Sequence, residues 1–183
     1  MLELIFESHA TTTDNEAGLA SGVFDAPLSA EGRRQARQLG ARHNLPFNRV
    51  FCSQLRRSFE TAALAFPDVT VMRDARLNEI DYGSLTRSAK QSIEQHKHRY
   101  IAEPYPGGES YTQAIHRVRD FIDSVMRHAE PGRYLVIGHR ATQYGLEHAL
   151  HGVAIVDAVT APWCWQPGWT YRVRARVPAE VTG

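Results

Sequence analysis

The sequence predicts an α/β protein of three layers, in which helices cover both faces of a mostly parallel sheet. Short apolar segments typical of strands alternate along the chain with segments of helical periodicity, which favours parallel strands joined by helices. One strand segment, 134–138, is apolar throughout, as expected of a central strand. The chain has 183 residues, of which 43% are hydrophobic. We expect residues 1–183 to form a single domain with its own core.

The first predicted elements are a strand, a loop and a helix. Residues 2–8 are apolar enough for a strand, and the polar residues 9–15 are typical of a loop at its carboxyl end. Ser29 then caps a helix that extends to about Asn44, with Glu31 in its first turn. The polar loop is therefore followed by an amphipathic helix.

Two short strands and a helix come next. The segments 49–53 and 69–72 are predicted as strands. Between them, residues 54–66 carry apolar side chains at helical spacing. This part of the chain thus continues the alternation of strand and helix.

The clearest helix in the sequence begins after Ser110, which forms a predicted capping box with Gln113. Apolar residues then repeat every three to four positions, so one face of this helix must pack on the sheet. The strand 134–138 follows, and a further helix is predicted over 140–151. Residues 171–177 are compatible with an edge strand.

Composition limits the partners and the location of the protein. The chain has 21 Lys and Arg residues against 20 Asp and Glu residues, so its formal charge of +1 gives no reason to expect nucleic acid or an anionic membrane as a partner. The apolar N-terminal run is short and is interrupted by Glu3 and Glu7, and no stretch is long enough to span a bilayer. We expect a cytoplasmic protein. The sequence leaves open whether it forms a homodimer.

Side chains with useful chemistry follow each of the four predicted strands. His9 comes after the first strand, Arg56 and Arg57 after the second, Glu79 after the third and His139 after the fourth. The carboxyl ends of parallel strands meet at one rim, where α/β proteins bind their ligands. Two imidazoles, a guanidinium and a carboxylate match the needs of phosphoryl transfer: a neutral nucleophile, donors for charged oxygens and an acid for the leaving group.

Five ordered motifs in this sequence resemble those of the histidine phosphatase (phosphoglycerate mutase-like) family, over roughly residues 2–152. They are Ser8-His9-Ala10-Thr11-Thr12-x-x-Asn15, Pro27-Leu28-Ser29-x-x-Gly32-x-x-Gln35-Ala36, Ser53-x-Leu55-x-Arg57-x-x-x-Thr61-Ala62, the loop 77–83 with Glu79, and Val136-Ile137-Gly138-His139. The segment 106–110 also resembles the family's entry to its long helix.

The resemblance implies a role for each of these residues. His9 would be the nucleophile that becomes phosphohistidine, and Glu79 would protonate the leaving alcohol and then activate water. Arg57 and His139 would hold the phosphoryl oxygens, and Asn15 would add a donor. The family uses no metal or other cofactor, and the spacing of Glu147, His148 and His151 does not form a zinc motif.

The first motif departs from the family pattern. The family begins it with Arg-His-Gly, where this chain has Ser8-His9-Ala10, and the loss of one charged donor to phosphate costs about 1.5–3 kcal/mol, or about 10- to 100-fold. After the second histidine the family usually carries a small residue, whereas this chain has Arg140. We expect Arg140 to compensate for the missing arginine; the alternative is that Arg140 pairs with Glu7 or lies at the surface.

The expected function is hydrolysis of the phosphate monoester of a small metabolite. Because Ser8 replaces an arginine, two alternatives stay open on the same fold: a phospho-ligand-binding, non-hydrolytic protein, or a site recruited to another reaction in specialised metabolism. A mutase is disfavoured, because the phosphoglycerate mutases of the family are longer and the insert here, residues 84–105, is short. The sequence does not specify the substrate.

Three other features have more than one interpretation. Cys52 precedes an arginine-containing turn, as in cysteine-dependent phosphatases, but their signature places arginine one residue later, where this chain has Ser58. The basic stretch in the insert 84–105 is either a solvated helix face or a lid over the strand ends. The Trp-rich segment 162–169 lines the pocket, packs the edge of the core or makes a dimer contact.

Overall fold

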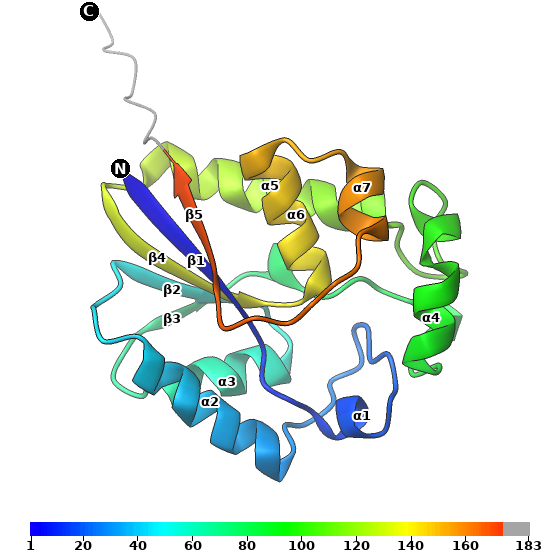
Figure 1. Cartoon of the computed structure of the whole chain (residues 1–183), viewed down its shortest axis with the longest axis horizontal. Helices are drawn as coiled ribbons and strands as arrows, with labels where there is room; N and C mark the ends of the chain where they lie inside the picture. The colour runs from blue at the N-terminus through cyan, green and yellow to red at the C-terminus, as the bar shows by residue number, and fades with distance from the viewer. Residues whose placement is uncertain (174–183) are drawn as a thin grey trace, which may run out of the picture.

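The computed structural model describes residues 1–173, and these form a five-stranded sheet with helices on both faces (Figure 1). The strands are β1 (Leu2–Ser8), β2 (Arg49–Cys52), β3 (Val71–Arg73), β4 (Gly132–Gly138) and β5 (Trp169–Val173). Their order across the sheet is β3-β2-β4-β1-β5. The strands β1 to β4 are parallel to one another, while β5 pairs antiparallel with β1. The predicted fold class, with 134–138 in a central strand, is confirmed.

Seven α-helices are found among the described residues. They are α1 (Thr13–Glu16), α2 (Ala30–Arg42), α3 (Arg56–Ala65), α4 (Lys90–His96), α5 (Tyr111–His128), α6 (Arg140–His151) and α7 (Ile155–Thr160). Single 3₁₀ turns occur at Ala75–Leu77, Gly83–Leu85 and Lys97–Tyr100. In Figure 1, α2 and α3 lie on one face of the sheet, α5, α6 and α7 lie on the other, and α4 stands at the end of the sheet.

Each face of the sheet packs against its own helices. On the α5 and α6 side, Leu4, Phe6 and Val136 form a core cluster with Phe121 and Leu146. On the α3 side, the alternate strand residues, among them Ile5 and Leu135, pack against Ala62. This division follows from the period of two in a strand, which sends successive side chains to opposite faces.

Local hydrogen bonds start the helices near the positions that the sequence predicts. The Oγ atom of Ser29 accepts a hydrogen bond from the N–H of Gly32 at 3.1 Å, and Ser110 and Gln113 form the expected capping box. A capping box between Thr12 and Asn15 also starts α1, inside a segment predicted as a loop.

The predicted element boundaries need small corrections. The helix predicted over 54–66 begins at Arg56, and the edge strand predicted over 171–177 begins at Trp169. Its predicted residues 174–177 lie outside the described part of the chain. The helix α7 was not predicted, and α4 lies in the basic stretch for which a helix was one of two interpretations, without predicted bounds; each is too short to display a helical repeat.

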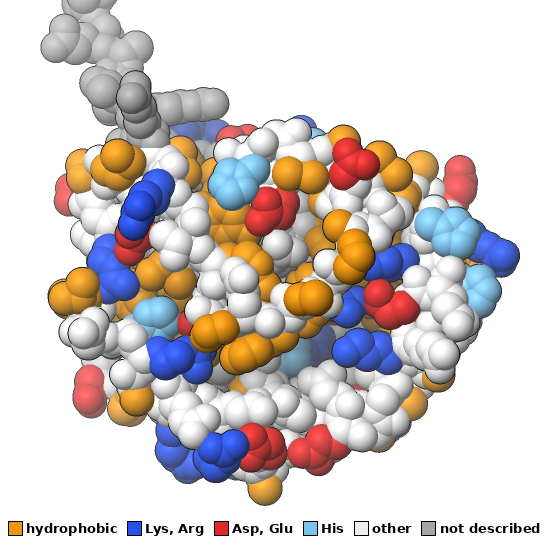
Figure 2. Space-filling view, in the orientation of Figure 1, with side chains coloured by type: hydrophobic (Ala, Val, Ile, Leu, Met, Phe, Trp, Pro, Cys, Tyr) orange, Lys and Arg blue, Asp and Glu red, His pale blue; other side chains and the backbone are white. Residues whose placement is uncertain are grey.

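The topology brings the ends of β1 and β4 together. These strands are parallel neighbours with Ser8 opposite Gly138, and the N–H of His9 donates to the carbonyl oxygen of Gly138 at 3.0 Å. His9 and His139 therefore leave the sheet at the same point. Figure 2 shows the face of the molecule on which this point lies, which is hollowed and has basic side chains inside and hydrophobic ones along one edge.

Candidate active site

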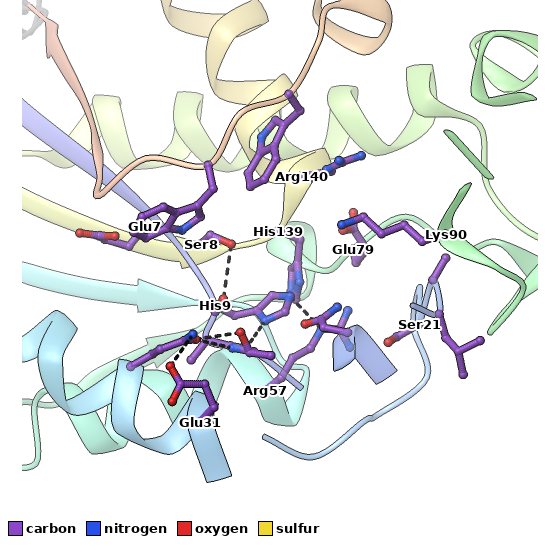
Figure 3. A pocket seen from close by; sticks show the side chains of 18 of the residues that line it. Glu7, Ser8, His9, Ser21, Glu31, Arg57, Glu79, Lys90, His139 and Arg140 are labelled. Atoms are coloured by element: carbon purple, nitrogen blue, oxygen red, sulfur yellow. Dashed lines mark hydrogen bonds between the residues drawn. The ribbon is translucent and has the colours of Figure 1, made fainter. Parts of the chain in front are cut away.

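His9 follows β1 and has a defined tautomer. Its Nδ1 atom lies 2.8 Å from the carbonyl oxygen of Ala10. A carbonyl can only accept, so Nδ1 carries the proton and the lone pair is on Nε2. That lone pair faces Arg57, whose Nε donates to it at 3.3 Å (Figure 3). His9 thus presents an unprotonated nitrogen to the guanidinium.

Arg57 is fixed in position from the first turn of α3. Its side chain is only 2% exposed, and besides His9 it binds two backbone carbonyls of the loop that follows α1. Nη1 donates to Phe24 at 2.9 Å, and Nη2 donates to Gly22 at 2.7 Å. The guanidinium is therefore held rigidly beside the imidazole, with its orientation set by three acceptors.

His139 completes the pair of imidazoles from the end of β4. Its ring centroid lies 5.0 Å from that of His9, and its Nε2 lies 2.7 Å from Oγ of Ser53. The residue is buried, and its Nδ1 has no hydrogen-bond partner among the described residues. Ser53 is the first residue of the third family motif, but the sequence did not predict that it orients His139.

The surroundings of both histidines favour the neutral ring. Burial, assisted by the positive charge of Arg57, lowers the pKa of His9 from 6.5 to about 3, against a smaller opposing effect of the hydrogen bond to Ala10. Burial, Arg57 and His9 lower the pKa of His139 well below 6.5. A neutral imidazole at physiological pH is what a nucleophile requires.

Glu79 enters from the loop after β3. Its Oε1 atom accepts hydrogen bonds from the N–H of Ile80 at 3.0 Å and from the N–H of Ala141, in the first turn of α6, at 3.1 Å. Arg117 of α5 holds the same loop by donating to the carbonyl oxygens of Asn78 and Glu79 at 2.7 Å and 3.2 Å. The carboxylate is thereby attached to the helix that starts at His139.

Ser8, Asn15 and Arg140 line the same cavity, with different contacts. The Ser8 hydroxyl donates to the carbonyl of His9 at 3.4 Å, and Oδ1 of Asn15 accepts from the N–H of Thr12 at 3.0 Å as part of the cap of α1. In Figure 3, Arg140 lies apart from His9, across the cavity.

Arg140 is engaged by two neighbours. Its guanidinium makes an ion pair with Glu94 of α4 and lies over the ring of Trp163, 4.8 Å from the centroid. The alternative partner considered from the sequence, Glu7, instead binds Arg42 at 3.0 Å. Arg140 is thus inside the cavity, but a carboxylate holds it.

The structure also brings in residues that sequence reasoning did not single out. Thr61 accepts from the N–H of Ala10 at 3.0 Å, and the Oε1 of Gln35 accepts from both the N–H and the hydroxyl of Thr11, at 3.0 Å and 2.8 Å. Gln35 belongs to the second family motif and Thr61 to the third, and this membership is the feature of the sequence that could have indicated a role at the site. They fix the loop that carries His9.

Together these groups line a cavity of about 530 Å³. It extends from His9 past α2 and α4 to Trp163 and Trp165. These two side chains of the Trp-rich segment therefore line the pocket, which was one of the three interpretations of that segment. Lys90, Ile93 and Glu94 of α4 also line it, so part of the insert 84–105 forms a wall of the cavity.

Cys52 differs from a reactive thiol. It is buried beneath the sheet's α3 face, and burial raises the pKa of its thiol to about 12. Since the thiolate is the nucleophilic form, this environment is opposite to the one that cysteine-dependent phosphatases require.

Two further observations concern metals and membranes. Within residues 1–173, no group of three His, Cys, Asp or Glu side chains is arranged to hold a metal ion. In the same residues, every helix is too short or too polar to cross a bilayer.

The structure is an α/β fold in which two neutral histidines, an arginine and a carboxylate lie around one cavity at the rim of a mostly parallel sheet. Residues 4–160 match the family model of the histidine phosphatase superfamily (branch 1), and the chain belongs to this family. The prediction of family and of a phosphatase of that family is confirmed.

Individual relatives agree with this assignment. Phosphoserine phosphatase 1 of Hydrogenobacter thermophilus is 28% identical over 166 residues, which cover 84% of this chain and 78% of the relative. A 2,3-bisphosphoglycerate-dependent phosphoglycerate mutase of Rhizobium etli is 29% identical over 177 residues, covering 87% of this chain and 85% of the relative.

Solved structures show the same fold. The alpha-ribazole phosphatase of Shigella flexneri superposes with a TM-score of 0.76 at 26% identity, covering 85% of this chain and 83% of that one. Bacillus stearothermophilus YhfR superposes with a TM-score of 0.81 at 23% identity, covering 95% and 92%. The second likeness concerns the fold alone.

Proposed function

We propose that this protein hydrolyses the phosphate monoester of a small metabolite through a phosphohistidine on His9, without a metal ion. The observation that carries the proposal is the state of the His9 ring: Nδ1 donates to the carbonyl of Ala10, so Nε2 is unprotonated and is the nitrogen that would attack phosphorus. Arg57 stands beside that nitrogen, where the phosphoryl oxygens would be.

The proposed reaction has two steps. In the first, Nε2 of His9 forms a bond to phosphorus while the bond to the ester oxygen breaks, and a protonated Glu79 gives its proton to the departing alcohol. In the second, Glu79 takes a proton from water, whose oxygen attacks phosphorus and breaks the P–N bond. Inorganic phosphate leaves, and the enzyme returns to its first state.

Arg57 and His139 are proposed to bind the phosphoryl oxygens as their charge develops. The 3.3 Å contact from Arg57 to His9 is long for a hydrogen bond, so a phosphoryl oxygen would readily replace it. Asn15, Ser8 and Arg140 are proposed to complete substrate binding from the same cavity. Arg140 would have to exchange Glu94 for the phosphoryl group to do so.

A panel of phosphate monoesters tests the proposal directly. We expect release of inorganic phosphate from at least one ester, and acid-labile, base-stable phosphate on the wild-type protein but not on His9→Ala. Full turnover in the presence of EDTA is also expected. Absence of turnover on every ester, together with no labelled protein, would contradict hydrolysis.

The second candidate is a protein that binds a phosphorylated ligand without hydrolysing it. One specific observation favours it: Ser8 replaces the family's arginine, while the expected substitute, Arg140, is bound by Glu94. Saturable binding of phosphate esters with no turnover would identify this case. Cytoplasmic location remains a prediction, and the oligomeric state stays open.

A further inference from the structure

The cavity is larger than a phosphoryl group requires. Its volume of about 530 Å³ falls among pockets that enclose a whole small molecule. A phosphoryl group at His9, Arg57 and His139 would occupy only its inner end. The outer part, between α2, α4 and the segment 161–168, is left for the alcohol part of the ester.

Trp165 offers a free aromatic surface in this outer part. The residue is 60% exposed, and its ring has no aromatic or cationic stacking partner among residues 1–173. Trp163, by contrast, is stacked with Trp169 at 5.9 Å between centroids and is contacted by Arg140. A large exposed indole in the wall of a cavity favours contact with a flat, apolar ligand group.

The charges of the outer cavity are already neutralised. Three of its arginines have carboxylate partners that line the same cavity. The pairs are Arg34 with Glu31, Arg42 with Glu7, and Arg140 with Glu94. A negatively charged leaving group would meet a carboxylate beside each of these arginines, so the outer cavity favours an uncharged one.

Lys90 is a further cation of the cavity besides Arg57 and the three paired arginines. No carboxylate within residues 1–173 lies at ion-pair distance from it. In Figure 3 it reaches into the cavity from α4 on the side where Glu79 lies, toward the inner end. Arg57 and Lys90 together carry two positive charges, which balance the two negative charges of a phosphoryl dianion. If Arg140 exchanges Glu94 for the phosphoryl group, the carboxylate of Glu94 loses its partner and adds a negative charge to the cavity. With or without this exchange, no unpaired cation is left for a charged leaving group among the described residues that line the cavity.

From these observations we infer that the cavity selects monoesters of uncharged alcohols that carry an aromatic or heteroaromatic ring, with the ring stacked on Trp165. This inference rests on the proposed function. It excludes as preferred substrates phosphorylated carboxylic acids, whose carboxylate would need an unpaired cation in the outer cavity.

The kinetic test uses esters with similar leaving alcohols. We expect kcat/KM for 3-phenylpropyl phosphate to exceed that for propyl phosphate and for 3-phosphoglycerate by about tenfold, the effect of one aromatic contact plus its apolar area. Trp165→Ala should remove this preference, and Trp165→Phe should retain part of it. Phe59→Ala is the matched control, because Phe59 is 37% exposed but lies outside the cavity.

A binding test separates this inference from the proposed function. 3-Phenylpropylphosphonate and propylphosphonate cannot be hydrolysed, and calorimetry should give a Kd about tenfold lower for the first, with the difference lost in Trp165→Ala. If the phosphonates show this difference but no ester is turned over, hydrolysis fails and the inference stands. Equal affinities, undetectable binding of both, or turnover with no preference for the ring would overturn the inference.

Discussion

The Nε atom of Arg57 donates to Nε2 of His9, the unprotonated nitrogen of the ring, with 3.3 Å between the two nitrogens. Each partner is independently fixed, His9 by the carbonyl of Ala10 and Arg57 by the carbonyls of Gly22 and Phe24. The position of the two groups is therefore set before any ligand binds. Such preorganisation removes the cost of arranging them during the reaction.

Removal of the nucleophile should abolish turnover without unfolding the protein. His9→Ala is expected to lower kcat/KM more than 100-fold, because it removes the neutral ring nitrogen that accepts from Arg57 and would attack phosphorus. Steady-state kinetics and thermal unfolding followed by circular dichroism measure both effects. His98→Ala, an exposed histidine of the insert, should behave as wild type. More than about a hundredth of wild-type activity in His9→Ala would exclude His9 as the nucleophile.

Glu79→Gln should affect substrates according to their leaving groups. The amide cannot donate a proton as an acid does, so alkyl phosphates should lose much more rate than p-nitrophenyl phosphate, whose leaving group needs little protonation. The ratio of kcat/KM for the two substrates in each protein is the measurement. Equal losses for both would argue against general acid catalysis by Glu79.

The compensating role of Arg140 predicts a specific pattern among variants. Arg140→Ala should cost about 10- to 100-fold in kcat/KM, and Ser8→Arg in that background should recover part of the loss. Glu94→Gln removes the ion-pair partner of Arg140, so inorganic phosphate should inhibit this variant more strongly than wild type. Arg34→Ala is the control, since Arg34 also lines the cavity and pairs with a carboxylate. If Arg140→Ala and Arg34→Ala have equal effects, Arg140 does not bind the phosphoryl group.

Ser53 is expected to act by positioning His139. Ser53→Ala removes a 2.7 Å hydrogen bond to a buried ring, which should lower kcat by about 2- to 10-fold with little change in KM. Ser53→Thr keeps the hydroxyl and should restore most of the rate. A change confined to thermal stability, with kcat unaltered, would contradict the positioning role.

The lowered pKa of His9 predicts a pH dependence of stability. Its pKa is about 3 in the folded protein and near 6.5 in the unfolded chain, so the unfolded state binds more protons between these values. The free energy of unfolding should therefore fall as the pH drops below 6.5, by at most about 1.4 kcal/mol per pH unit from this residue. Urea unfolding at pH 7 and pH 5 measures it. His9→Ala should show a smaller decrease, and an equal decrease would contradict the prediction.

The sequence was sufficient for the order of elements wherever a segment had a strong pattern. The strand 2–8 and the helix 140–151 have the predicted bounds, and the latter begins directly after His139. Short elements were missed because one or two helical turns contain too few residues for a repeat. The helix α1 depends on a local capping box that the strand-and-loop interpretation of 9–15 did not consider.

For the candidate site, the rim of the sheet could be predicted from the sequence, but the side-chain contacts could not. Parallel strands place His9 and His139 at one edge, and this could be argued from topology alone. The ion pair of Arg140 with Glu94 could not, because it joins the start of α6 to an insert whose helix had no predicted bounds. Side-chain partners between distant segments depend on packing, which no local pattern encodes.

The pairing of β1 has a consequence for how this protein is made. Leu2–Ser8 precedes the other four strands in the sequence, but its two neighbours in the sheet begin at residues 132 and 169. The N-terminal strand emerges from the ribosome long before either partner exists. Contacts of such large sequence separation form late and slow the folding of a domain. A truncated chain that ends before residue 132 would carry His9, Arg57 and Glu79 but could not assemble them around His139.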